Sequence, residues 1–148
     1  MSKWKQALDA AVSGAVQAHL MPPHIQYLSL PPISSWKDNT ITIDWQATED
    51  IYQGGGMVFG GYLSALADYA AGTAMLTCIE DDQQFATRNL EMTFKRPVKA
   101  GLVTIIAEVR PSDAQEFDVE VQFLNADNNL CAVCHVRQTL ISLTRDIA

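Results

Sequence analysis

Residues 54–78 read GGGMVFGGYLSALADYAAGTAMLTC, and this stretch decides the fold. A glycine-rich loop leads to a second glycine pair, Gly60 and Gly61, after which small and apolar residues dominate. This pattern predicts one apolar helix over residues 60–78. Asp68 is the only charged residue in the stretch. Because a lone carboxylate on an apolar helix is costly unless it is paired or used in chemistry, Asp68 is the first candidate site residue.

The rest of the chain predicts a second helix and a set of strands. Apolar residues at helical spacing predict a helix over 3–19, which the two prolines that follow would end. The segment up to residue 32 reads as an irregular connector. Because short turns join consecutive strands, the sheet is expected to be an antiparallel meander. Apolar and polar residues alternate in the expected strands, which cover 40–45, 90–94, 103–109, 117–123 and 130–141.

One apolar helix and a half-apolar sheet predict an α+β fold, with the helix packed on the apolar face of the sheet. The 148 residues are 48% hydrophobic and 18% charged, which indicates a globular chain with a sizeable core. We expect one domain over residues 1–148. Residues 1–35 would form the N-terminal helix and connector, and residues 36–145 the core.

Charge and cysteine content exclude several classes of partner. The net charge of −7 argues against nucleic acid and anionic membranes. No apolar run is long enough to span a bilayer, and no signal peptide is evident, so three cysteines indicate reduced thiols and a cytoplasmic protein. Cys131, Cys134 and His135 have the spacing of a haem attachment motif, but they lie in an expected strand. We expect no haem, no metal and no other cofactor.

Gly60 and Gly61 suggest a second element of a site. Free N–H groups at a helix start can hold a developing oxyanion. Asp68 lies seven or eight residues further on, which is roughly 10–12 Å along the helix axis. One helix therefore cannot offer both groups to one carbonyl, whereas two antiparallel helices across a two-fold axis can. This predicts a dimer with sites at its interface; the alternative is a plain loop-to-helix junction and a solvated acid.

The motif Phe59-Gly60-Gly61, followed by Asp68, resembles the His-Gly-Gly…Asp signature of hotdog-fold acyl-CoA thioesterases of the phenylacetyl-CoA thioesterase type. The resemblance covers about residues 36–141. It implies a hotdog fold, in which an antiparallel sheet wraps around one long central helix. It also implies a homodimer, often paired into a homotetramer, that hydrolyses an acyl-CoA thioester to free acid and coenzyme A.

The resemblance assigns roles to five residues. Asp68 matches the catalytic acid, either as nucleophile or as general base. Gly60 and Gly61 match the glycine pair that supplies the backbone donor, and Gly60 is the better candidate by spacing. Gln53 falls where the family often has an amide side chain near the reacting carbonyl. Thr87 falls near where a hydroxyl residue often orients the water.

Substrate-binding residues are expected around this site. Phe59 replaces the family's histidine and has no side-chain hydrogen bond to offer. Activity could therefore be reduced or tuned to an aromatic or fatty acyl group. Ser64 is a further candidate, and Arg88, Lys95 and Arg96 are the nearest cations for the coenzyme A phosphates.

Two rival functions remain open at this point. Phe59 favours a non-catalytic acyl-CoA-binding protein. A hotdog dehydratase would need a histidine beside the acid, and none lies near the Asp68 helix in the sequence.

Overall fold

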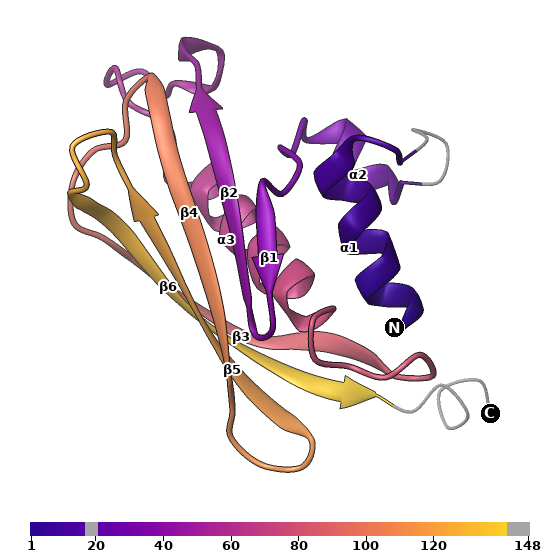
Figure 1. Ribbon diagram of the computed structural model, residues 1–148. Helices are drawn as coiled ribbons and strands as arrows, with labels where there is room; N and C mark the ends of the chain where they lie inside the picture. Colours follow the sequence, from indigo (N-terminus) through magenta and orange to yellow (C-terminus); the bar gives the residue numbers. More distant parts are fainter. Residues whose placement is uncertain (17–20, 142–148) are drawn as a thin grey trace.

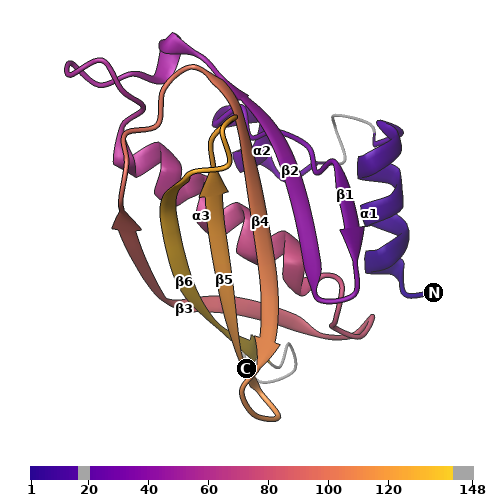
Figure 2. The ribbon, with the colours of Figure 1, turned by 60° about the vertical axis from the view of Figure 1, so that its left-hand side comes forward.

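A computed structural model describes residues 1–16 and 21–141 (Figure 1). Its elements in chain order are α1 (Lys3–Ser13), α2 (Pro23–Tyr27), β1 (Ser35–Lys37), β2 (Thr40–Ala47), the 3-10 helix η2 (Glu49–Ile51), α3 (Gly60–Met75), β3 (Gln84–Phe94), β4 (Gly101–Pro111), β5 (Glu116–Leu124) and β6 (Leu130–Ile141). The sheet curves around α3, and α1 lies beside β1 at the edge of the molecule (Figures 1 and 2). None of the described helices is long and apolar enough to cross a membrane.

All strand pairs in the sheet are antiparallel, and the spatial order is β1-β2-β4-β5-β6-β3. The predicted α+β architecture is therefore confirmed, with α3 packed on the sheet. The predicted meander holds for β4, β5 and β6 but is wrong for β3, which pairs with β6 and forms the edge opposite β1. The chain crosses from β3 to β4 past the loop before α3, where the Val58 N–H donates to the Val98 carbonyl (2.9 Å).

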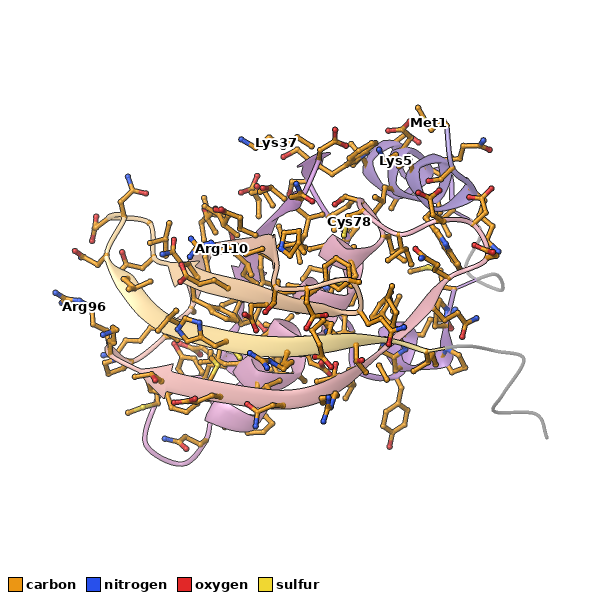
Figure 3. All side chains as sticks on the ribbon, turned by 90° about the horizontal axis from the view of Figure 1, so that it is seen from below. Met1, Lys5, Lys37, Cys78, Arg96 and Arg110 are labelled. Atoms are coloured by element: carbon orange, nitrogen blue, oxygen red, sulfur yellow. The ribbon has the colours of Figure 1, made fainter. Side chains whose placement is uncertain are left out.

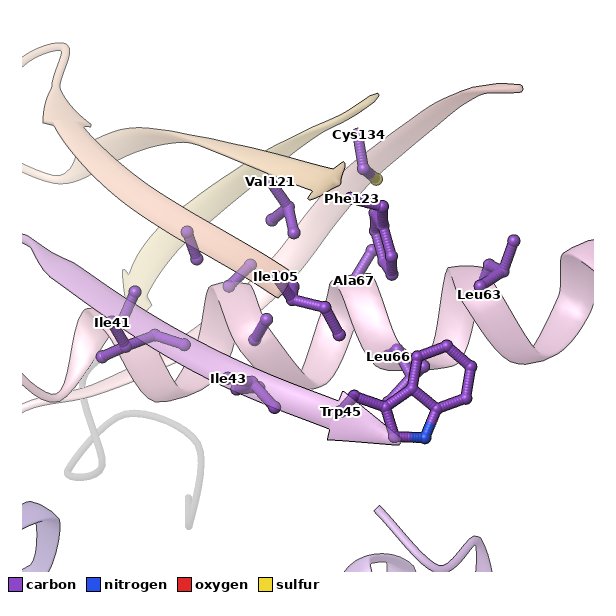
Figure 4. Packing of buried hydrophobic residues seen from close by; sticks show 14 of the residues in the cluster. Ile41, Ile43, Trp45, Leu63, Leu66, Ala67, Ile105, Val121, Phe123 and Cys134 are labelled. Atoms are coloured by element: carbon purple, nitrogen blue, oxygen red, sulfur yellow. The ribbon is translucent and has the colours of Figure 1, made fainter. Parts of the chain in front are cut away.

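The core lies between α3 and the concave face of the sheet (Figure 4). Alanines at positions 67, 70, 71 and 74 of α3 are fully buried, and their small side chains let the helix lie close to the strands. Leu66 and Phe123 fill the remaining space from the two sides, and both are also fully buried. Strands β2, β4, β5 and β6 each bury one face, as their period of two predicts, whereas the residues of β3 are half-buried or exposed.

Helix and strand limits differ from the predictions where a local feature decides them. The α1 helix ends at Ser13 because Gly14 adopts a left-handed conformation (φ 73°), and residues 17–19 of the predicted helix lie outside the described residues. The α3 helix ends three residues early, at Met75. The short α2 and β1 were not predicted, because elements of five and three residues carry too little periodicity. Residues 142–145 of the expected core also lie outside the described residues.

Two tyrosines attach α3 to the N-terminal connector. The Tyr62 hydroxyl donates to the Leu28 carbonyl (2.9 Å), and the Tyr69 hydroxyl donates to the Pro31 carbonyl (2.8 Å). Since these tyrosines lie two helical turns apart, they present their hydroxyls on the same side of α3. The connector thereby covers one side of the helix and leaves another, which carries Asp68, exposed.

Candidate active site

Asp68 lies on an uncovered stripe of α3 and is exposed in the single chain. Its Oδ1 accepts a hydrogen bond from the Thr87 hydroxyl (2.7 Å). Within the described part of the chain, Oδ2 has no partner. Its neighbours Leu66, Ala67 and Ala70 face the core, so the carboxylate itself lies outside the apolar interior of the single chain. Asp68 is thus a fixed carboxylate with one oxygen free.

Cys134 on β6 is a buried thiol that the charge of Asp68 affects. Burial, with the Asp68 charge as a second cause, raises the pKa of Cys134 to about 12. The thiol therefore stays protonated at neutral pH and cannot act as a nucleophile. Its sequence neighbour His135 is exposed and lies on the opposite face of the strand, so this pair does not form a common site.

A β-bulge positions Thr87 opposite α3. The β3–β6 register shifts between Thr87 and Asn89, so one residue, Arg88, has no partner on β6. Before the bulge, Phe85 and Thr87 are directed towards α3; after it, Leu90 packs against the core. In a regular strand, residues three apart such as Thr87 and Leu90 would lie on opposite faces. The bulge therefore lets a polar site residue and a core residue share one face.

The first turn of α3 presents unpartnered backbone donors. Phe59 occupies the N-cap position and gives no side-chain hydrogen bond. The Tyr62 N–H already donates to the Phe59 carbonyl (3.1 Å). The N–H groups of Gly60 and Gly61 have no partner among residues 1–16 and 21–141, and such orphan donors suit an anion.

Two phenyl rings surround the glycine pair. A Cβ on Gly60 would lie 2.8 Å from the Phe94 ring, and one on Gly61 would lie 2.7 Å from the Phe59 ring. Both rings are exposed, at 43% for Phe59 and 53% for Phe94. The absence of side chains at 60 and 61 therefore lets the rings approach the backbone, and it creates an apolar surface next to the free amides.

The structure brings together some of the predicted site residues and not others. Thr87 and Asp68 are in contact, whereas the glycine pair lies roughly 10–12 Å away along α3. Gln53 is exposed in the loop before α3, where its N–H donates to the Met57 carbonyl (2.8 Å), and its side chain makes no hydrogen bond to Asp68 or Thr87. Ser64 donates its hydroxyl to the Gly60 carbonyl (2.9 Å), so this hydroxyl is used within the helix.

The predicted phosphate-binding cations also divide into two groups. Arg88 forms an ion pair with Glu116 (2.7 Å), so its guanidinium is occupied. Lys95 and Arg96 are exposed beyond the end of β3 and make no ion pair with any described residue. Figure 3 shows Arg96 at the opposite end of the molecule from Met1 and Lys5.

The sequence reasoning missed Gln138. It lies on β6 directly opposite Thr87, is fully buried, and has its Oε1 3.1 Å from the Thr87 hydroxyl oxygen. The sequence does contain a signal for Gln138. It lies two and four residues after the buried Val136 and Cys134, so on a strand it shares their inward face. Phe94 was also missed, since its alternation indicated only a strand residue.

Comparisons with known proteins agree on one family. Residues 55–132, which are 78 of the 148, match the Thioesterase superfamily. A protein of Saccharolobus solfataricus, whose name describes an unproven esterase, is 31% identical over 84 residues. That match covers 57% of this chain and 59% of the relative.

Two solved structures share the fold. A thioesterase of Haemophilus influenzae superposes with a TM-score of 0.73 at 23% identity, covering 80% of this chain and 82% of that one. The PaaI protein of the E. coli phenylacetic acid degradation operon superposes with a TM-score of 0.73 at 21% identity, covering 90% and 95%. With a family match over more than half of its length and this shared architecture, the chain belongs to the thioesterase superfamily and has a hotdog fold.

Proposed function

We propose that this protein is an acyl-CoA thioesterase that produces a free acid and coenzyme A. The observation that carries the proposal is the Asp68 carboxylate, which Thr87 holds through one oxygen and which has its other oxygen free of the described residues. The same helix begins with two amides that have no partner among those residues. Membership of the thioesterase superfamily supports thioester hydrolysis, and the resemblance to phenylacetyl-CoA thioesterases supports an acyl-CoA substrate.

The reaction uses these groups in one of two ways. In the first, Asp68 Oδ2 attacks the thioester carbonyl carbon, the C–S bond breaks, and coenzyme A leaves as the thiolate, which takes a proton from solvent; water then cleaves the anhydride, which releases the acid and restores the Asp68 carboxylate. In the second, Oδ2 takes a proton from water as the water oxygen attacks the carbonyl carbon, the C–S bond breaks, and the leaving thiolate receives that proton. In both, the carbonyl oxygen becomes negatively charged, and the Gly60 N–H stabilises it with the Gly61 N–H beside it.

A homodimer supplies the two halves of this site. The distance along α3 separates Asp68 from the glycines of its own chain, so we assign the glycines to a second copy. Two exposed features support this assembly. The first is the uncovered stripe of α3, which includes Gly61, Ala65 and Asp68 and whose small side chains permit close approach. The second is β3, an edge strand of 11 residues with a free side (Figure 2). Long unprotected edges are uncommon in monomers. Two dimers could pair into a tetramer.

Coenzyme A and the cell compartment complete the proposal. Lys95 and Arg96 are the free cations near the end of β3, and we assign the coenzyme A phosphates to them rather than to Arg88, which is bound to Glu116. The three cysteines are unpaired, which supports a reducing compartment, the cytoplasm.

Thiol release from a panel of acyl-CoA thioesters tests the function. Asp68→Asn has nearly the same shape and still accepts the Thr87 hydrogen bond, but it is neither a nucleophile nor a base. We expect the variant to lose about 100-fold or more of kcat. A wild-type protein that hydrolyses no member of the panel refutes the function. An Asp68→Asn variant as fast as wild type refutes the mechanism alone.

One observation favours the rival function, an acyl-CoA-binding protein without turnover. The Phe59 ring lies against Gly61 and is 6.3 Å from the Tyr62 ring, so an apolar ring stands beside the donor pair where the family has a histidine. Phe59→His restores the family's side chain at this position. Tight acyl-CoA binding by calorimetry, negligible turnover in the wild type and a large gain in rate with Phe59→His would establish the rival.

A further inference from the structure

Gln138 is a buried amide whose hydrogen bonds are incomplete. Its side chain is fully buried on β6, between Thr87 of β3 and Phe117 of β5 in the strand register. Its Oε1 contacts the Thr87 hydroxyl, and its Nε2 has no partner in the described part of the chain. A buried amide N–H₂ without an acceptor is rare in folded proteins, so its orientation needs a reason.

The Thr87 hydroxyl cannot satisfy both of its neighbours in this orientation. Asp68 Oδ1 lies 2.7 Å from Thr87 Oγ1, and Gln138 Oε1 lies 3.1 Å from the same atom. Both neighbours are acceptors, whereas a hydroxyl has one hydrogen to donate. Rotating the Gln138 amide by 180° exchanges its oxygen and nitrogen without changing its shape. Nε2 then donates to Thr87 Oγ1, and the hydroxyl hydrogen is left for Asp68.

We propose that Gln138 is a positioning residue that donates to Thr87 and thereby directs the Thr87 hydroxyl towards Asp68. The result is a directional chain from the buried amide through the hydroxyl to the carboxylate. Hydrogen bonds to a charged acceptor are stronger than neutral ones, so this chain holds Asp68 Oδ1 and leaves Oδ2 for the reaction. This role in catalysis rests on the proposed thioesterase function, although the hydrogen-bond chain itself does not.

A double-mutant cycle tests whether Gln138 acts through Thr87. Gln138→Met keeps the volume and removes the donor, and Thr87→Val removes the hydroxyl at constant shape. We expect Gln138→Met to lower kcat about tenfold in the wild-type background with KM unchanged, and to have no further effect in the Thr87→Val background. A wild-type kcat in Gln138→Met overturns the proposal, and so does an equal loss in both backgrounds, which indicates a general packing effect.

An NMR measurement decides the amide orientation without any assay of activity. The assigned side-chain N–H₂ resonances of Gln138 are compared between wild type and Thr87→Val, so the result does not depend on folding of the methionine variant. If Nε2 donates to Thr87, one of the two protons shifts upfield in Thr87→Val. Unchanged resonances overturn the proposal. If the wild type hydrolyses no acyl-CoA, the proposed function fails, and this spectrum still decides whether the chain exists.

Discussion

The Gly60 amide can be removed without ending the helix that it begins. Gly60 is the first residue of α3, where proline is well tolerated, and Phe59 before it is extended (ψ 143°), as a residue before proline prefers. Gly60→Pro therefore deletes the proposed oxyanion donor without breaking the helix. We expect kcat to fall about 100-fold.

Gly60→Ala is the matched control for this prediction. Both substitutions place a Cβ against the Phe94 ring, which would lie 2.8 Å away and must shift, but alanine keeps the N–H. The measurement is kcat on the best acyl-CoA substrate of the panel. Equal rates for the proline and alanine variants would show that the amide is not an oxyanion donor.

Tyr69 makes the stability of the fold sensitive to alkaline pH. Burial raises its pKa from 10.0 to about 12, so the neutral phenol stabilises the folded state. This contribution is fully present below pH 10 and is lost as the pH rises towards 12. We expect Tyr69→Phe to cost about 1 kcal/mol at neutral pH, because the bond to the Pro31 carbonyl is lost. The variant should also show a flatter fall in stability between pH 10 and 12.

Urea unfolding at a series of pH values checks the prediction for Tyr69. Tyr27→Phe is the control, since Tyr27 is exposed on α2. If Tyr69→Phe and wild type lose stability equally over this pH range, Tyr69 is not the group responsible.

At the residue scale, the sequence indicated part of the site. The isolation of Asp68 in an apolar stretch and the glycine pair before it can be read directly from the amino-acid sequence. The family resemblance indicated Thr87 as a residue that orients the water, but not its contact with Asp68, which joins residues 19 apart across two elements. Gln138 is 51 residues from Thr87, and only strand pairing brings the two together.

At the scale of elements, the bulge in β3 is the feature that most directly connects fold and site. Deleting Arg88 would leave Thr87 and Leu90 two positions apart in a regular strand, still on one face, but it would remove the local bend and twist that the bulge gives β3. We expect the deletion to lower the free energy of unfolding by about 1–3 kcal/mol, because the straightened strand packs less closely against α3.

Arg88→Ala separates the bulge from the side chain. It keeps the extra backbone residue and removes only the ion pair with Glu116, in which the arginine side chain is 61% exposed. We expect a loss of less than about 1 kcal/mol. Urea unfolding of both variants gives the comparison, and equal losses would mean that the bulge itself has no structural role.

The strands were predictable because alternation records which face is buried, and the limits of β6 match the prediction completely. Strand order was less accessible. The position of β3 beside β6 depends on contacts with α3 and on the path of residues 95–100. Neither produces a periodic pattern of apolar residues that could be recognised in the sequence. The only trace of the bulge in the sequence is that Thr87 and Leu90, which share a face, are an odd number of residues apart. This trace can be recognised only when the partner strand is known.

At the scale of the whole molecule, the proposed shared site predicts complementation between inactive variants. Asp68→Asn retains working glycines and Gly60→Pro retains a working carboxylate. Refolded together, they form heterodimers in which one of two sites has both groups intact. We expect about a quarter of wild-type activity from random pairing.

Separate refolding of each variant is the control, and sedimentation reports the oligomeric state. If the mixture is no more active than the separate variants, each site belongs to one chain. A monomer with full activity would exclude the shared site as well.

The packing of the Phe59 ring against Gly61 limits the order in which these two positions can change during evolution. Any side chain at 61 would begin 2.7 Å from that ring, so a substitution there is disfavoured while the phenylalanine remains. Position 59 can change first, because its replacement by a smaller residue without a ring removes the obstacle. A lineage that first loses the ring at position 59 would therefore gain freedom at the neighbouring donor, and the reverse order would meet a steric barrier.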